Sequence, residues 1–156
     1  ELARALSAEE DIAVSYARQL PEKDSGEIEK YTRQFNYPEE SCIKGKEQLP
    51  EMGIKTYFCS NVCAAYKKEI FRQLGGFERH VNFNEDMLFA AKAVQAGYKI
   101  AYAAGAKVYH CHNYTCAEQF HRNFDNGVSQ AQHPEVFREL PSESEGVKLV
   151  KQTAAH

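Results

Sequence analysis

Residues 74–86 read Leu-Gly-Gly-Phe-Glu-Arg-His-Val-Asn-Phe-Asn-Glu-Asp. The residues before this stretch carry apolar side chains at helical spacing, and Gly75 stands where a left-handed C-terminal cap belongs. Asn84 is a favourable N-cap for a second helix. The stretch therefore predicts two helices joined by a loop, with the adjacent carboxylates of Glu85 and Asp86 at a helix N-terminus. Such a pair is suited to acid–base chemistry.

The rest of the sequence predicts an α/β protein. Helices are expected over residues 1–6, 25–35, 67–74 and 85–96 and after the capping box of Thr115 and Glu118, and strands over residues 11–16, 55–66, 99–102 and 107–110. The last two strands should flank a turn at Gly105. Gly127 should bend or stop the Thr115 helix. Residues 22–50 are expected to be mostly a long loop, and the chain should divide into a domain at 1–133 and a polar tail at 134–156.

Composition limits the classes of function. The chain has 156 residues, 43% hydrophobic and 26% charged, which suits one globular domain with a modest core. A formal net charge of -3 and the lack of a Lys or Arg run give no attraction to nucleic acid, so no nucleic-acid partner is expected. No apolar stretch reaches the roughly 20 residues that a membrane span needs. The chain begins with Glu1, and we expect it to be a segment of a longer protein.

The cysteines suggest free thiols. Five cysteines without a framework spacing fit a reducing compartment better than a disulfide-linked secreted fold. An alternative is a zinc site, whose ligands would be Cys59, Cys63, His110, His112 and Cys116. The spacings C-x3-C and H-x-H-x3-C do not match the tight knuckles of structural zinc, and we therefore expect no zinc.

Several motifs in order resemble one enzyme family. They are Ala64-Ala65-Tyr66-Lys67, Leu74-Gly75-Gly76-Phe77, Asn84-Glu85-Asp86, the turn at Gly97-Tyr98, Val108-Tyr109-His110 and residues 119–127, preceded by Phe35-Asn36-Tyr37-Pro38. This series resembles the C-terminal half of the catalytic domain of inverting family 2 glycosyltransferases, in the rhamnosyltransferase-like branch. The resemblance implies a partial GT-A fold, with a mixed sheet flanked by helices. The N-terminal nucleotide-binding half, with its metal-binding Asp-x-Asp, is not in this sequence.

The resemblance also implies roles for individual residues. Asp86 would be the catalytic base, assisted by Glu85, whose like charge raises the apparent pKa of the pair. His110 would complete the coordination of a divalent ion held by the Asp-x-Asp half. Acceptor-binding groups are expected at Ser60, Asn61, Tyr66, Gly75, Gly76 and Arg122.

Each role has a simpler alternative. Glu85 and Asp86 could serve only to stabilise their helix by interacting with its dipole. His110 could be a histidine at the end of a strand that is hydrogen-bonded to the backbone. Gly75 and Gly76 could form only a cap, and Arg122 could pair with Glu118 or Asp125. If all of these held, the chain would be a non-catalytic interaction domain that binds a protein through the aromatic residues between 31 and 37.

The resemblance finally implies partners and surroundings. The full-length enzyme would use Mg²⁺ or Mn²⁺, a nucleotide-sugar donor and a glycan or lipid-linked glycan acceptor in surface polysaccharide synthesis. It would be cytoplasmic, at the inner face of the cytoplasmic membrane if it is bound to a membrane at all. The fragment alone should be inactive and hold no tightly bound metal. Because a half-sheet exposes a strand edge, we expect it to form a homodimer or to exchange segments.

Overall fold

A mixed sheet with the strand order β2-β4-β1-β3 forms the centre of the computed structural model, which describes residues 1–112, 114–138, 140 and 143–154. The strands are β1 (Ile12–Leu20), β2 (Cys42–Lys44), β3 (Ala64–Tyr66) and β4 (Lys99–Tyr109). The α-helices are α1 (Leu2–Leu6), α2 (Glu27–Asn36), α3 (Leu49–Met52), α4 (Lys68–Gln73), α5 (Glu85–Gln95), α6 (Cys116–Gln132), α7 (Pro134–Phe137) and α8 (Glu143–Ala154). Two 3-10 turns, η1 (Lys46–Gln48) and η2 (Gly53–Tyr57), complete the elements.

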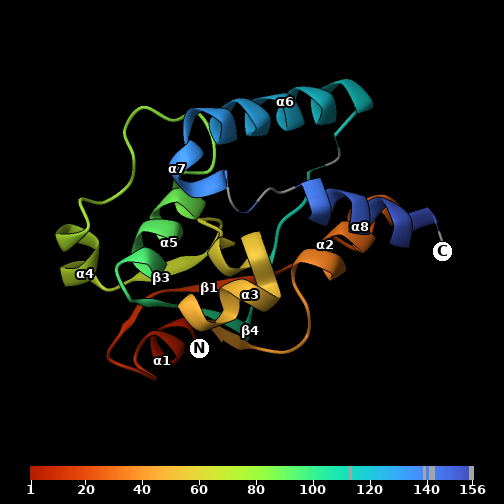
Figure 1. Ribbon diagram of the computed structural model, residues 1–156. Coiled ribbons are helices and arrows are strands. Elements are labelled where there is room, and N and C mark those ends of the chain that lie inside the picture. The colour runs from red at the N-terminus through yellow and green to blue at the C-terminus, as the bar shows by residue number, and fades with distance from the viewer. Residues whose placement is uncertain (113, 139, 141–142, 155–156) are drawn as a thin grey trace.

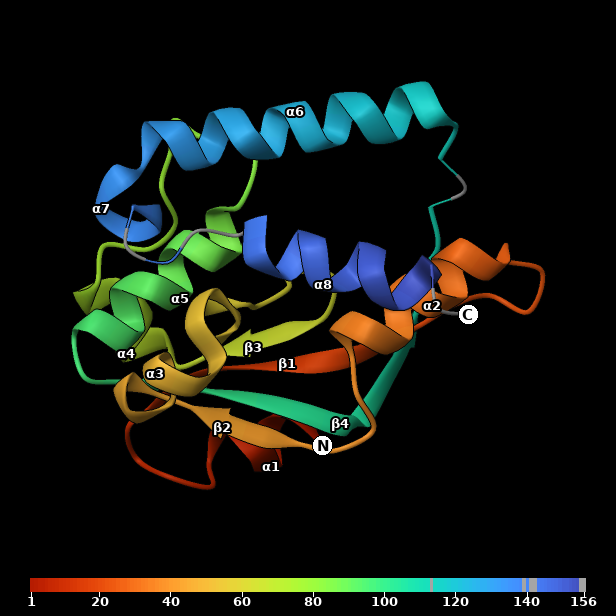
Figure 2. The ribbon, with the colours of Figure 1, turned by 45° about the vertical axis from the view of Figure 1, so that its right-hand side comes forward.

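The sheet is covered on both faces. Helix α1 packs on one face, and α5, α3 and α2 lie on the other, with α6 farthest from the sheet (Figures 1 and 2). Strand β1 is parallel to β4 and antiparallel to β3, and β2 is antiparallel to β4. The predicted α/β fold with a mixed sheet flanked by helices is therefore confirmed.

Strand β4 differs from the prediction of two short strands around a turn at Gly105. It is one strand, but its register against β1 shifts: Ala17 lies opposite Ala103 and Arg18 opposite Lys107. Residues 104–106 thus form a bulge, and a bulge bends a strand without ending it. The glycine marks this irregularity and not a hairpin turn.

The apolar segment 55–66 also differs from its prediction as a buried strand or strand pair. Only residues 64–66 form a strand, β3, while η2 and a loop precede it. Tyr57 and Cys59 are buried without strand pairing, so their apolar character reflects burial and not β structure. Conversely, the segment 22–50 contains the predicted helix, α2, but also the unpredicted strand β2.

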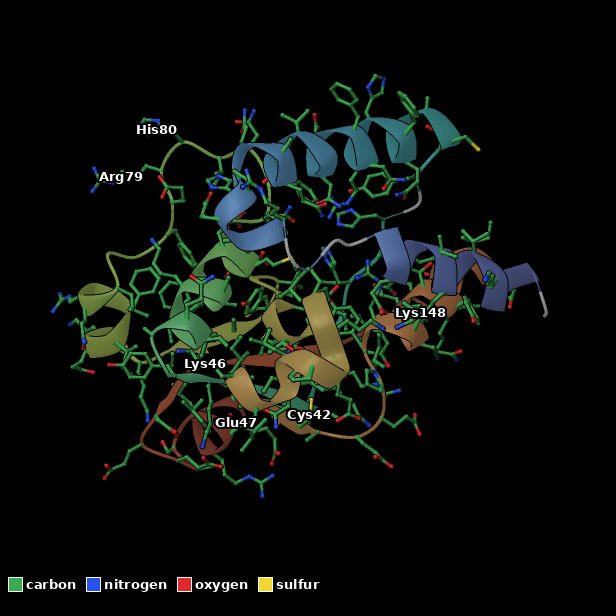
Figure 3. All side chains as sticks on the ribbon, in the orientation of Figure 1. Cys42, Lys46, Glu47, Arg79, His80 and Lys148 are labelled. Atoms are coloured by element: carbon green, nitrogen blue, oxygen red, sulfur yellow. The ribbon has the colours of Figure 1, made fainter. Side chains whose placement is uncertain are left out.

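The two helices around residues 74–86 agree with the prediction. Gly75 follows α4 with a φ of 82°, and α5 begins directly after Asn84. The side chain of Asn84 does not cap the helix, because it donates instead to Asn126 Oδ1 on α6 (2.7 Å). Arg79 and His80 lie on the loop between α4 and α5, and both side chains are exposed (Figure 3).

Helix α6 begins at the predicted capping box. Thr115 Oγ1 accepts from the Glu118 amide, and the Glu118 side chain accepts from the Thr115 amide (2.8 Å). The prediction that Gly127 bends or stops this helix is wrong, because α6 runs through to Gln132. One glycine in an exposed helix costs about 1 kcal/mol, which a long helix tolerates.

The segment predicted as a polar tail contains α7 and α8 in its described part, whereas residues 139, 141–142 and 155–156 lie outside the description. Val136 and Phe137 on α7 are buried in the main core. Helix α8 lies beside α2 in both views, and its Glu145 pairs with Lys55 on η2 (3.1 Å). None of the helices among the described residues combines the length and apolar character that a membrane span requires.

Candidate active site

A cavity of about 400 Å³ opens where several segments converge. They are the C-terminal end of β1, helix α2, the loop 58–62, the start of α5, and residues 110–112 and 114–122. Six of the residues singled out from the sequence line it: Ser60, Asn61, Glu85, Asp86, His110 and Arg122. Residues far apart in the chain are thus brought to one site. Tyr66, Gly75 and Gly76 do not line it.

Asp86 is held by two backbone amides. Its Oδ2 accepts a hydrogen bond from the Asn61 amide (3.0 Å), and its Oδ1 accepts from the Met87 amide in its own helix (2.8 Å). Burial raises the pKa of Asp86, and the charge of Glu85 raises it further, against the lowering effect of the two amides. Because each carboxylate oxygen has two lone pairs, these bonds leave acceptor capacity in the cavity.

Asn61 joins the two carboxylates. While its amide holds Asp86, its side-chain Nδ2 donates to Glu85 Oε1 (3.0 Å) and its Oδ1 accepts from the Tyr66 hydroxyl. The Tyr66 ring packs against Phe77 and Phe89, with centroid distances of 5.4 and 5.3 Å, and burial raises its pKa far above the usual value. Tyr66 thus holds the Asn61 side chain in place from the aromatic core.

Gln19, Arg33 and Glu29, which the sequence prediction missed, form a polar chain with Ser60 in the cavity lining. Gln19 Nε2 donates to Ser60 Oγ (2.7 Å), and Arg33 Nη1 donates to Gln19 Oε1. Arg33 Nε also donates to Glu29 Oε1 (2.8 Å). The i, i+4 spacing of Glu29 and Arg33 on a predicted helix could have indicated this pair. No local signal marks Gln19, which lies near the end of β1.

His110 and His112 line the same cavity. His110 directly follows β4, as predicted, and its amide donates to the Leu20 carbonyl (3.1 Å). The His110 and His112 rings meet edge to face at 4.3 Å, and His112 stacks on Tyr114 at 4.8 Å. Burial is the main cause that lowers the pKa of both histidines, with nearby Arg33 and Arg122 adding to it. Both imidazoles are therefore mainly neutral at pH 7.

Arg122 on α6 does not make the ion pair that the simpler alternative proposed. Its guanidinium lies 4.7 Å from the centre of the Phe83 ring, and Nη1 donates to the Tyr114 hydroxyl (3.2 Å). The Glu118 carboxylate is instead occupied by Thr115. Arg122 thus remains a cation at the rim of the cavity.

The two glycines serve the backbone. Both have positive φ, and a Cβ on Gly76 would stand 3.1 Å from the Phe71 ring. They form the end of α4, outside the residues that line the cavity.

The donor set does not make a complete metal site. Within the described ranges, no three His, Cys, Asp or Glu side chains are grouped so that they could hold an ion. A hard divalent cation needs several oxygen ligands. Among the described residues that line the cavity, only Glu29, Glu85 and Asp86 carry carboxylates, and Glu29 is paired with Arg33. His110 could contribute one ligand at most. The ligands of the zinc alternative, Cys59, Cys63, His110, His112 and Cys116, are described residues and form no such group either.

The aromatic residues of the alternative interaction surface are turned inward. Tyr37 is buried, and Tyr31 and Phe35 are only partly exposed. Lys55 Nζ lies 3.8 Å from the centre of the Phe35 ring. The segment 31–37 thus offers no exposed aromatic patch to a partner protein.

Comparison with known proteins finds curated relatives for most of this chain. No protein-family model matches the chain. The chain is similar to bacterial rhamnosyltransferases of O-antigen synthesis. It is 46% identical over 141 residues to the O-antigen chain rhamnosyltransferase RfbN of Salmonella typhimurium. This match covers 90% of this chain and 45% of that protein. It is 44% identical over 144 residues to the O-antigen chain rhamnosyltransferase WbaN of Salmonella anatum, covering 92% of this chain and 46% of that protein. The chain therefore spans about half the length of the curated relatives it matches.

Proposed function

We propose that this chain is the acceptor-side part of a nucleotide-sugar-dependent rhamnosyltransferase of O-antigen synthesis, with a family 2, GT-A type catalytic domain. Two kinds of support converge on this function. The chain is 46% identical to a rhamnosyltransferase over 90% of its length. The cavity is lined by a carboxylate, neutral histidines and hydrogen-bonding groups, which suit the deprotonation and binding of a sugar hydroxyl.

The reaction is a single displacement with inversion. Asp86 removes the proton from the acceptor hydroxyl, whose oxygen forms a bond to the anomeric carbon of the donor. The bond between that carbon and the diphosphate oxygen breaks at the same time, and the nucleoside diphosphate leaves with the electron pair. The attack comes from the face opposite the leaving group, which inverts the anomeric centre.

The main support for this proposal is the raised pKa and the fixed orientation of the Asp86 carboxylate. A general base works best when its pKa approaches the working pH, and burial together with Glu85 raises the pKa of Asp86. The amides of Asn61 and Met87 fix its orientation, so the base needs little reorganisation when it meets the hydroxyl. Ser60, Asn61 and Arg122 line the same cavity and are our candidates for acceptor contacts.

The donor side needs more than this chain provides. We propose that the full-length protein holds Mg²⁺ or Mn²⁺ beside the donor diphosphate, where a divalent ion neutralises the charge of the leaving group. His110 is the candidate ligand from this chain. Because the described residues alone do not form such a site, we expect the isolated chain to be inactive.

The test compares two Asp-to-Asn variants of the full-length protein. With a nucleoside diphosphate rhamnose and an O-antigen intermediate as acceptor, Asp86→Asn should lower the transfer rate by about 10²–10⁴-fold. It should keep its affinity for the nucleotide. Asp24→Asn makes the same chemical change at an exposed position outside the cavity and should keep full activity. Full transfer by Asp86→Asn would refute the role of the base.

One observation favours a second candidate function, a non-catalytic domain in which Asp86 only stabilises the start of α5. Its Oδ1 accepts from the Met87 amide in the first turn of α5, as a helix-stabilising residue would. That function predicts that Asp86→Asn lowers the free energy of unfolding and leaves transfer unchanged.

A further inference from the structure

Lys44 on β2 is buried more completely than any other ionisable side chain among the described residues. Its relative exposure is 1%, and its register partner on β4 is Ile100. Among the described residues no carboxylate is paired with it. A buried charge without a counter-ion is costly unless hydrogen bonds satisfy it, so its contacts call for an explanation.

Three oxygen atoms accept hydrogen bonds from the Lys44 ammonium. Nζ donates to the Tyr16 hydroxyl (3.0 Å), to the Lys55 carbonyl (3.1 Å) and to the Phe58 carbonyl. The Tyr16 and Phe58 rings also face the ammonium, with centroids at 4.9 and 5.8 Å. An ammonium group has three donors, and this arrangement uses all of them.

The carbonyls of residues 55 and 58 lie at the end of η2, where the backbone enters the candidate active site. Phe58 lines the cavity, and Asn61, three residues further, holds Asp86 through its amide and Glu85 through its side chain. A short run of backbone therefore links the Lys44 ammonium to the catalytic carboxylates.

We propose that Lys44 is a positioning residue for the candidate active site: its charged ammonium fixes the backbone at residues 55–58 and so sets where Asn61 holds Asp86. The structural part of this proposal stands on the three hydrogen bonds alone. Its effect on the transfer rate rests on the proposed function.

The positioning should depend on pH. Burial lowers the pKa of Lys44 to about 8. Deprotonation leaves the amine two N–H donors and removes the charge that strengthens its hydrogen bonds to the Lys55 and Phe58 carbonyls. The loop 58–61 should then become less ordered, and the transfer rate should fall above about pH 8.

Four other ionisable groups surround Lys44. They are Tyr16 on β1, Cys42 on β2, Cys59 in the loop and Lys55 on η2. Burial raises the pKa of Tyr16, of Cys42 and, to about 12, of Cys59, so these groups stay neutral. The Lys55 ammonium forms an ion pair with the Glu145 carboxylate at 3.1 Å. In the cavity, burial raises the pKa of Tyr37 to about 12.

The test uses Lys44→Met, which keeps an unbranched side chain of similar length but has no charge or donor. Lys46→Met is the matched control, because Lys46 is two residues away with an exposed side chain (Figure 3). The first measurement is hydrogen exchange of the Asn61 amide in the full-length protein at pH 7. Protection should fall in Lys44→Met and stay at the wild-type level in Lys46→Met.

The second measurement is the transfer rate between pH 6 and 10. In the wild type kcat should decline above about pH 8, whereas in Lys44→Met it should be about 10–100-fold lower at pH 7 and lack this decline. An unchanged decline in Lys44→Met, or unchanged protection of the Asn61 amide, overturns the proposal. If Lys44→Met does not fold, the wild type alone decides it, because the protection factor of the Asn61 amide must fall between pH 7 and 9.

The two proposals fail separately. If Asp86→Asn retains transfer, the proposed function is wrong, but the exchange of the Asn61 amide still tests Lys44. If Asp86→Asn abolishes transfer and Lys44→Met behaves as the wild type, only the positioning role is wrong.

Discussion

The backbone amide of Asn61 donates a hydrogen bond to Asp86 Oδ2 at 3.0 Å, across a gap of 25 residues in the sequence. This bond joins the loop after η2 to the first turn of α5. It places the carboxylate at the cavity without an ion pair, since its partners are neutral amides. The two amides therefore orient the carboxylate without neutralising its charge, and it remains available as a base.

The side chain of Asn61 can be removed without removing its amide. Asn61→Ala should keep the bond to Asp86 but leave the Tyr66 hydroxyl and Glu85 without their partner. We expect a loss of about 1–3 kcal/mol in the free energy of unfolding, measured by urea denaturation, because a buried donor becomes unsatisfied. Transfer should fall less than in Asp86→Asn. The opposite order of activities would mean that Asn61 contributes more to the reaction than the proposed base.

Activity should fall in acid because Asp86 must be ionised to accept a proton. Its pKa is raised above the usual 3.8, so kcat should decrease as the pH falls through this raised value. The contribution of Asp86 to the free energy of unfolding changes with pH in the opposite direction. Since the folded state binds this proton more tightly than the unfolded chain, the contribution of Asp86 to stability is present at low pH and is lost as the pH rises through the folded pKa. Rate profiles and urea denaturation between pH 4 and 8 measure both, and an increase of kcat toward acid would contradict the assignment.

Glu85→Gln isolates the effect of charge. The new side chain still has an oxygen that can accept from Asn61 Nδ2, but it no longer repels the ionised Asp86. The pKa of Asp86 should therefore fall, and the acid limb of the kcat profile should move to lower pH. The same profile in the exposed-site control Glu22→Gln should match the wild type. A shift to higher pH in Glu85→Gln would show that Glu85 acts in another way.

Two glycine substitutions should have opposite effects on stability. Gly76→Ala forces a φ of 71° on alanine and brings its Cβ within 3.1 Å of the Phe71 ring, so we expect a loss of at least about 1–2 kcal/mol. Gly127→Ala lies in α6 with nothing within 4 Å of the new Cβ and should gain about 0.5–1 kcal/mol. Thermal denaturation measures both. A Gly76→Ala protein that is as stable as the wild type but binds the acceptor poorly would contradict this expectation. It would instead support the acceptor-binding role predicted for Gly76.

Short-range signals in the sequence predicted the parts of the fold that depend on neighbouring residues. The cap at Gly75, the start of α5 after Asn84 and the capping box of Thr115 each involve residues within four positions of one another. Such signals also put Glu85 and Asp86 in the first turn of a helix. The resemblance to glycosyltransferases then implied the role that we propose for this turn.

Only the tertiary structure decided what surrounds those carboxylates. Ser60 bonds to Gln19 across 41 residues, and Lys44 reaches the Phe58 carbonyl from an edge strand of three residues. In the sequence Lys44 looks like an ordinary solvated lysine, because its three acceptors are a hydroxyl and two backbone carbonyls that no residue pattern reveals. The sequence by itself determined where α4 ends, where α5 and α6 start, and which carboxylates stand at a helix N-terminus. Burial and the long-range pairing of β1, β2 and β4 decided which polar groups face those carboxylates, because these contacts form only when distant segments pack together.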